Sequence, residues 1–235
     1  MRIILLAVLL AVSSVAHAKS LFTFSNQPGE HGVGVRFIKQ YDGSRPFAKS
    51  RSFLAGGRAK DDHGRPIQTV IWYPAAKGGK PVRYNDYLSL IGWETNFNLS
   101  PREEKQLVDA WLKMVTDGKR PAQVEAERTK PMWAVRDAAP KNGKFPVVIY
   151  APSINNTAFE NADLSEFLAS HGYIVIASPT IGADRRYIKW DLASAEMQAA
   201  DIRFLIDYAR TLPHADMSRV AVAGFSWGGL TNILA

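Results

Sequence analysis

Apolar residues along the chain form short continuous runs separated by stretches with helical spacing. The runs Phe145–Tyr150, Tyr173–Ala177 and Arg219–Ala223 are rich in Val, Ile and Ala, which predicts buried parallel strands. The stretches Ala158–Ser170 and Asp191–Arg210 lie between these runs and predict helices. The order strand, helix, strand, helix, strand predicts an α/β fold with a mostly parallel sheet and right-handed crossovers.

Each of these helices carries an apolar face that we expect to pack on the sheet. Gly172 is expected to close the first helix. The predicted inward positions are Leu164, Phe167 and Leu168 in the first helix, and Leu192, Ala195, Ala199, Ile202, Ile206 and Ala209 in the second.

Two more strands are expected earlier in the chain. Val33–Tyr41 and Ile67–Tyr73 alternate enough to predict a pair of strands, the second ended by Pro74. Their mixed pattern favours an antiparallel edge of the sheet. Gly43–Gly64, between them, is rich in Gly, Ser, Arg and Lys and predicts a loop.

Residues 77–140 are interpreted as a helical insertion before the central strands. Ser100 is the expected N-cap of a helix, with Pro101 at its first position and Glu103 completing a capping box. A second short helix is expected over 122–128. The insertion either caps the active site or only packs beside the sheet. The predicted apolar stripe of its first helix is Leu107, Ala110, Trp111 and Met114.

The first 18 residues have the organisation of a secretory signal peptide. Arg2 supplies the positive start and Ile3–Val12 the apolar core, which at ten residues is too short to cross a bilayer. Ala16-His17-Ala18 is an A-x-A cleavage site, so we expect cleavage after Ala18 and a secreted or periplasmic protein. The alternative interpretation is a short buried helix. No later segment of the sequence predicts a transmembrane helix.

Composition narrows the class of protein further. The 235 residues suit a single α/β domain, and the hydrophobic content of 46% supports a sizeable core. The absence of cysteine excludes disulfides and thiol catalysis. The net charge of +7 comes with no nucleic-acid-binding motif, so nucleic acid is not an expected partner.

The most informative motif is Gly224-Phe225-Ser226-Trp227-Gly228, a G-x-S-x-G sequence between a predicted strand and a predicted helix. A turn this sharp strains the central residue and requires side-chain-free neighbours, hence Gly224 and Gly228. The strain exposes the Ser226 hydroxyl, which we predict to be a nucleophile, and aims the Trp227 N–H at a developing oxyanion. The alternative is a glycine-rich turn with an incidental serine.

The chain resembles the α/β-hydrolase superfamily, most closely its dienelactone hydrolase and platelet-activating-factor acetylhydrolase-like branch. The resemblance rests on V-A-V-A-G-F-S-W-G-G, with P-V-V-I-Y-A-P-S, L-A-S-H-G-Y-I-V-I-A-S-P and L-P-H-A-D upstream. It implies that the turn over 151–156 holds the second oxyanion donor, which by register is the Ile154 N–H. Asn155 or Asn156 could supply a side-chain donor instead. The family places its catalytic Asp and His after the elbow helix, and this sequence ends at Ala235.

No histidine of the expected mature chain is a credible base for Ser226. His171 and His214 precede central strands, so they are expected at the sheet edge opposite Ser226, about 15–20 Å away. His31 and His63 precede the two early strands and are rejected for the same reason; none of the four shows metal-ligand spacing. We therefore expect a C-terminally incomplete hydrolase domain over 19–235, inactive by itself.

The predicted function is a secreted serine hydrolase that acts on a small-molecule carboxylic ester or related acyl bond, without a metal or organic cofactor. One alternative keeps the enzyme but changes the bond to a peptide or a lactone. The other is a non-catalytic secreted binding protein, or an inactive remnant, on the same scaffold. The sequence does not indicate an oligomeric state.

Overall fold

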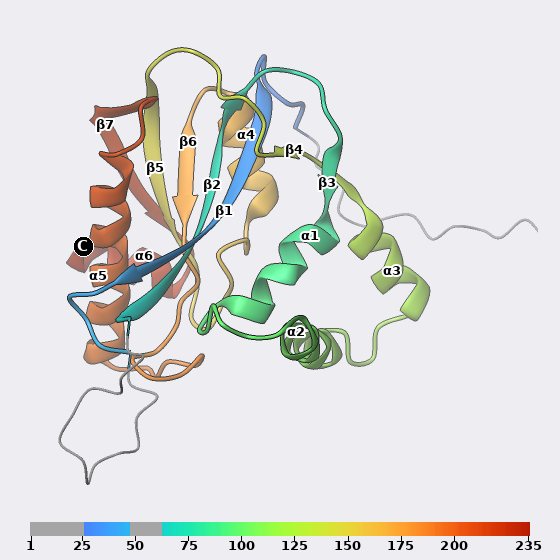
Figure 1. Ribbon diagram of the computed structural model, residues 1–235, viewed down its shortest axis with the longest axis vertical. Coiled ribbons are helices and arrows are strands. Elements are labelled where there is room, and N and C mark those ends of the chain that lie inside the picture. The colour runs from blue at the N-terminus through green and yellow to red at the C-terminus, as the bar shows by residue number, and fades with distance from the viewer. Residues whose placement is uncertain (1–25, 48–62) are drawn as a thin grey trace, which may run out of the picture.

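The computed structural model describes residues 26–47 and 63–235. Its seven-stranded sheet has the order β3-β4-β1-β2-β6-β5-β7 (Figure 1). Strand β5 is parallel to both β6 and β7, and β2 is antiparallel to both β1 and β6. The strands are β1 (Gly32–Asp42), β2 (Arg65–Ala75), β3 (Pro81–Arg83), β4 (Pro131–Arg136), β5 (Phe145–Ala151), β6 (Ile174–Ala177) and β7 (Ala215–Gly224).

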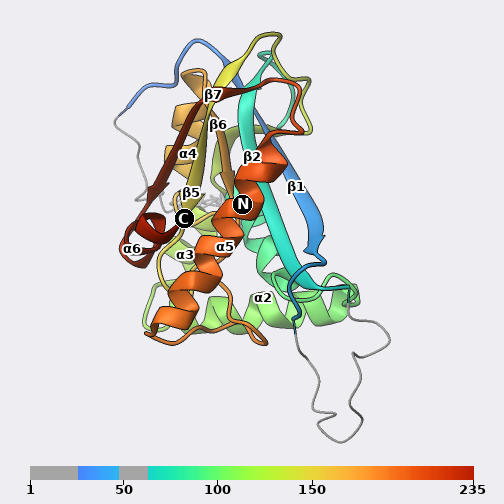
Figure 2. The same cartoon turned by 90° about the vertical axis from the view of Figure 1, so that its left-hand side faces the viewer.

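Helices cover both faces of the sheet (Figures 1 and 2). Helix α4 (Ala162–Ser170) contributes to a core cluster with Val70 and Trp72 on one face, and α5 (Leu192–Ala209) to a second cluster with Ile71 and Ile149 on the other. The alternation of residues 70 to 72 between clusters follows from the two-residue period of a strand. The predicted α/β architecture is confirmed.

Strands β1 and β2 are antiparallel to each other, as predicted, but they do not form an edge of the sheet. All eleven residues of β2 are buried, and β1 is paired on its other side by β4. Pro74 does not end β2, because the strand continues to Ala75. The polar residues that made its pattern look mixed are buried; Gln68 donates through Nε2 to the Leu90 carbonyl at 2.8 Å, and the Thr69 hydroxyl accepts from Gln40 at 3.0 Å.

The segment 77–140 contains strands as well as helices. It holds β3, α1 (Tyr84–Leu88), the 3-10 turn η1 (Ser89–Trp93), α2 (Pro101–Val115), α3 (Pro121–Thr129) and β4. The capping box at Ser100 and Glu103 forms as expected. The two short strands were not predicted, and they extend the sheet beyond β1.

The apolar stripe predicted for α2 is largely wrong. Leu107, Ala110 and Met114 are exposed, whereas Trp111 packs against the core as predicted, together with Val108 and Leu112. Both sets have helical spacing, so the sequence pattern alone did not distinguish the two faces.

Two further inward predictions are wrong at helix starts. Leu164 of α4 and Leu192 of α5 are exposed, although the later inward positions of α5 are buried or half-buried. Helix α4 begins at Ala162 rather than at 158, because the preceding residues form the turn that leads from β5. Gly172 follows α4 with φ of +93°, as expected of a glycine that closes a helix.

Strand β7 is parallel to β5 as predicted, but it is not buried. Of its ten residues only Ala215 is buried. Within the described residues β7 is the outermost strand, and α6 (Trp227–Thr231) and the 3-10 turn η2 (Asn232–Leu234) follow it directly.

The predicted signal peptide lies outside the described residues. None of the helices in the described part of the chain is long and apolar enough to cross a membrane.

Candidate active site

The G-x-S-x-G motif lies where β7 ends, at the lower edge of the sheet in Figure 1. Ser226 joins β7 to α6 with φ 52° and ψ −113°, outside the regions that ordinary side-chain-bearing residues favour. Strain of this kind costs about 1–3 kcal/mol and persists only where neighbouring structure enforces it. Ser226 is exposed. The backbone therefore presents this hydroxyl at the end of the sheet.

Steric contacts explain the two glycines that flank the serine. A Cβ at Gly224 would lie 2.5 Å from the carbonyl carbon of Gly228, and a Cβ at Gly228 would lie 2.0 Å from the carbonyl oxygen of Ala151. Gly229 differs, since its Cβ would meet nothing nearer than 3.6 Å. The close approach at Gly228 fixes the start of α6 against the end of β5.

The buried side chain of Trp227 holds the turn in place. Its side chain is 4% exposed and packs with Ile188 and Ala195, with half-buried Ile154 against the same cluster. The structure thus brings the two predicted oxyanion residues, Trp227 and Ile154, to one place. Trp190, which was not singled out in the sequence, contacts Trp227 edge to face, with 5.2 Å between ring centroids.

The turn that carries Ile154 is held by side-chain hydrogen bonds. Glu160 accepts from the Ser153 N–H at 2.8 Å and also from the Ser153 hydroxyl. Pro152 has no N–H and that of Ser153 is engaged, so Ile154 is the first residue of the turn whose N–H could serve a substrate.

The two asparagines of this turn have structural partners. Asn155, at φ 57°, accepts the Ile188 N–H on its Oδ1 at 2.6 Å. The amide of Asn156 donates to Ser153 and to Glu160. Asn156 therefore already uses its donor group inside the turn. Asn155 connects the turn to the loop after β6.

The loop over 180–190 connects the site to the inserted segment. Arg186 forms an ion pair with Glu94, which follows η1 and is 2% exposed, and donates to the Thr180 carbonyl at 3.1 Å. Burial raises the pKa of Glu94 to about 7 against the opposing effect of Arg186. Thr180 in turn donates its N–H to the Asn156 carbonyl at 3.0 Å.

This path from Glu94 to the Ile154 turn could not be found from the sequence, because its members are distant along the chain. In the same loop, Asp184 and Arg185 pair with each other in solvent. Within the described residues, no hydrogen bond or ion pair joins Asp184 or Arg185 to the elbow.

The four described histidines have structural surroundings of their own. His31 contacts Glu30 and Phe145, and His171 lies at the end of α4 with Phe167. His214, just before β7 begins, donates through Nδ1 to the Gly143 carbonyl at 3.2 Å. These three lie at the edge opposite Ser226, as predicted.

The prediction that His63 lies at the sheet edge opposite Ser226 is wrong. Strand β2 runs antiparallel to β6, so its start lies at the same edge as Ser226. His63 is nevertheless separated from β7 by the width of β6 and β5, and its ring contacts Tyr41 at 5.2 Å.

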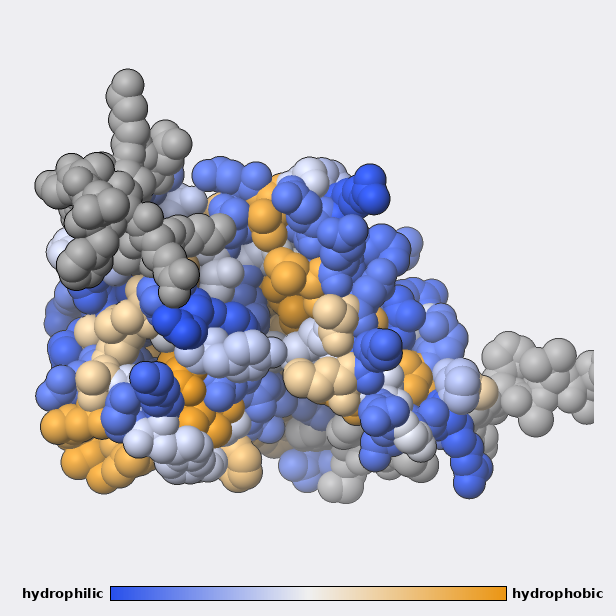
Figure 3. Space-filling model, turned by 90° about the horizontal axis from the view of Figure 1, so that it is seen from below, coloured by the Kyte–Doolittle hydropathy of each residue, from blue (hydrophilic) through white to orange (hydrophobic). Residues whose placement is uncertain are grey.

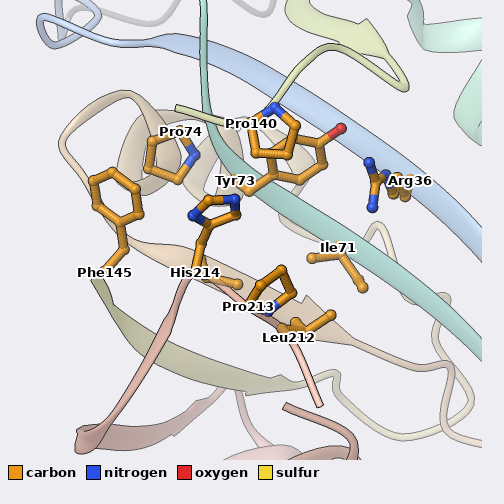
Figure 4. Close-up of a pocket in the computed structure, with 10 residues that line it drawn as sticks. Arg36, Ile71, Tyr73, Pro74, Pro140, Phe145, Leu212, Pro213 and His214 are labelled. Carbon is orange, nitrogen blue, oxygen red and sulfur yellow. The ribbon is translucent and has the colours of Figure 1, made fainter. Parts of the chain in front are cut away.

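A cavity of about 160 Å³ lies at the edge opposite the elbow (Figure 4). Apolar residues from the end of β2 and the starts of β5 and β6 line it, with Arg36 and His214. Its position separates it from Ser226, so it is not part of this site. No group of three or more His, Cys, Asp or Glu residues that could hold a metal ion occurs within 26–47 and 63–235.

Comparison with known structures identifies the architecture. A ferulic acid esterase from Streptomyces cinnamoneus matches 92% of this chain with a TM-score of 0.56 at 20% sequence identity. The chain has the α/β-hydrolase fold. The resemblance seen in the sequence is thereby confirmed at the level of the fold.

The match spans 57% of the esterase chain. A dienelactone hydrolase-like promiscuous phosphotriesterase from metagenomic libraries is more distant, with a TM-score of 0.41 and 13% identity over 86% of this chain and 53% of its own. No family model matches the sequence, and no curated protein does.

Proposed function

We propose that this chain carries the nucleophile and the oxyanion site of a secreted or periplasmic serine hydrolase, of the dienelactone hydrolase-like branch, that cleaves carboxylic esters or related acyl bonds. The observation that carries the proposal is the strained backbone of Ser226 between two sterically required glycines at the end of β7. Strain at an exposed serine has no packing benefit, and it is the geometry that the nucleophile of this fold needs.

The reaction follows from the groups around the elbow. The Ser226 hydroxyl attacks the carbonyl carbon of the substrate, and the N–H groups of Trp227 and Ile154 receive the negative charge that develops on the carbonyl oxygen. At the first residue of a helix, as Trp227 is in α6, the N–H has no acceptor within that helix. No step of this scheme calls for a metal ion.

The proton of Ser226 requires a base that the described residues do not place at the elbow. We propose that a histidine and an acidic residue from further polypeptide complete the site. The share of the esterase chain that this chain spans, 57%, is consistent with a larger functional unit. A residual rate without such a base would be lower by several orders of magnitude.

The test is hydrolysis of 4-nitrophenyl butyrate by the natural protein and two serine variants. Ser226→Ala is expected to abolish turnover above background. Ser218→Ala is the matched control, because Ser218 is an exposed serine of the same strand, and it should leave turnover within about twofold. Equal activity of the two variants would contradict the proposal and favour a non-catalytic binding protein.

A further inference from the structure

Trp190 is a large aromatic residue that the fold leaves open beside the elbow. It is 74% exposed, whereas Trp227, which it contacts edge to face, is 4% exposed. Trp227 directly follows Ser226. An exposed tryptophan held in place by a buried one is a preformed surface, since the contact fixes one part of the ring and leaves the rest to solvent.

The surroundings of Trp190 are apolar where they face the elbow. Ile188 is buried against Trp227, and Ile154 packs on the same cluster. Tyr187 and Leu192, three residues before and two residues after Trp190, are 54% and 65% exposed. Figure 3 views this edge of the molecule from below and shows hydrophobic residues gathered in patches on it.

Trp190 lies beside the proposed oxyanion site, so it is in a position to contact the acyl group of a bound substrate. A carbonyl oxygen held by the N–H groups of Trp227 and Ile154 places its carbon substituent near both residues, and Trp190 adjoins the same cluster. The charges of the loop are largely balanced, because Arg185 pairs with Asp184, Arg186 pairs with Glu94, and Lys189 lies close to Asp191. With its charges balanced, the loop offers a substrate mainly the exposed flat face of the Trp190 indole ring.

We propose that Trp190 determines specificity by stacking against a planar aromatic ring in the acyl group of the substrate. The proposal rests on the proposed function, because it takes the carbonyl to be bound at the elbow. Trp190 does not take part in the chemical step. Its contribution is the preference for a flat ring over a saturated one of the same size, which the π-face of an indole provides.

The test compares two esters with the same carbon skeleton, one with a flat unsaturated acyl group and one with a saturated acyl group. Methyl cinnamate and methyl 3-cyclohexylpropanoate are titrated by calorimetry into the protein with Ser226→Ala, so that neither ester can be consumed. Simple hydrophobicity favours the saturated ester, so tighter binding of the cinnamate reports stacking. We expect the cinnamate to bind more tightly, and Trp190→Ala to weaken its binding about threefold to tenfold with little effect on the saturated ester.

Two controls separate stacking from a loss of structure. Trp190→Phe keeps a flat ring and should retain most of the preference. Tyr173→Ala removes a partly exposed aromatic residue before β6, at the opposite edge, and should leave both affinities unchanged. The proposal is overturned if the cinnamate shows no saturable binding, if both esters bind equally, or if Trp190→Ala leaves the preference intact.

These outcomes are independent of the chemistry of Ser226. Failure of the proposed function appears as unchanged ester turnover in Ser226→Ala, whereas failure of this inference appears as lost discrimination in binding. One can therefore fail while the other holds.

Discussion

Strands β2 and β7 lie in the same sheet, separated by β6 and β5, but they differ in burial and in the polar groups at their ends. Every residue of β2 is buried, and only Ala215 is buried among the ten residues of β7. Strand β2 begins at Arg65, whose buried guanidinium pairs with Asp201. Strand β7 instead leads into the strained turn at Ser226. Within the described residues, the buried contacts are therefore concentrated around β2, and the proposed nucleophile follows the exposed strand β7.

Two networks of buried polar groups connect β2 and its neighbours to distant elements. Arg65 is 0% exposed, pairs with Asp201 of α5 through two hydrogen bonds and donates to two carbonyls of the loop after β6. On the other face Tyr87 donates to Glu166 of α4 at 2.6 Å and accepts from Trp72 at 2.7 Å. Such networks stabilise one arrangement only while every member is present.

The largest expected effect is therefore at the start of β2. Arg65→Met should lower the free energy of unfolding by about 3–5 kcal/mol, because it leaves a buried carboxylate with only Arg45 as its partner. Urea denaturation measures the loss. Arg210→Met, which removes a surface pair with Asp207, should lower it by less than about 1 kcal/mol. Similar losses in both variants would refute the comparison.

At the elbow that follows β7, the largest loss of stability should come from adding a methyl group to Gly228. Gly228→Ala would place a Cβ 2.0 Å from the Ala151 carbonyl oxygen, so the elbow must shift. We expect a loss of about 1–3 kcal/mol in unfolding free energy together with loss of activity. Gly229→Ala, whose Cβ meets only ordinary contacts, should change neither by much. A tolerated Gly228→Ala would show that the elbow is not constrained as described.

The pH dependence of stability should report the buried acid on the β2 side. Burial raises the pKa of Glu166 to about 7, outweighing the hydrogen bonds donated by Tyr87 and Trp133. The folded state then binds a proton that the unfolded state, with a pKa near 4.5, releases. The contribution of Glu166 to the free energy of unfolding is fully present below pH 4.5. It decreases by about 1–3 kcal/mol as the pH rises through 7.

Denaturation at pH 5 and pH 8 tests this expectation. Stability should be higher at pH 5 as far as Glu166 is concerned, and Glu166→Gln should make the slope between the two values shallower. An unchanged slope in the variant would mean that Glu166 is ionised in the folded protein.

The smallest expected effect is a gain of stability at the serine itself. Ser226→Gly relieves the positive φ and should raise the free energy of unfolding by about 1 kcal/mol while abolishing activity. Ser218→Gly, which removes a hydroxyl that donates to Asp216, should instead lower it slightly. A destabilised Ser226→Gly protein would show that the serine contributes contacts that outweigh its strain.

The parts of this molecule that sequence predicts are those with local causes. The central strands follow from continuous apolar runs, the start of α2 from Ser100 and Glu103, and the elbow from two glycines around Ser226. Each of these depends on residues that are close along the chain. The fold class follows from their order.

The parts that were missed depend on tertiary contacts. Strand β3 has three residues, too few to show a period, and β4 alternates over only six. Leu107 and Val108 are adjacent and both apolar, and only the position of the core selects the second. Trp190 and Arg186 share the loop over 180–190, but their partners Trp227 and Glu94 lie far away along the chain, so no local pattern marks these contacts.

The most direct test of the central claim is labelling of the natural protein with a fluorophosphonate, followed by peptide mass spectrometry. Our account predicts a single adduct on Ser226, absent from Ser226→Ala and retained in Gly229→Ala. An unlabelled protein that is folded and complete, or an adduct on another serine, would contradict the assignment of Ser226 as the nucleophile.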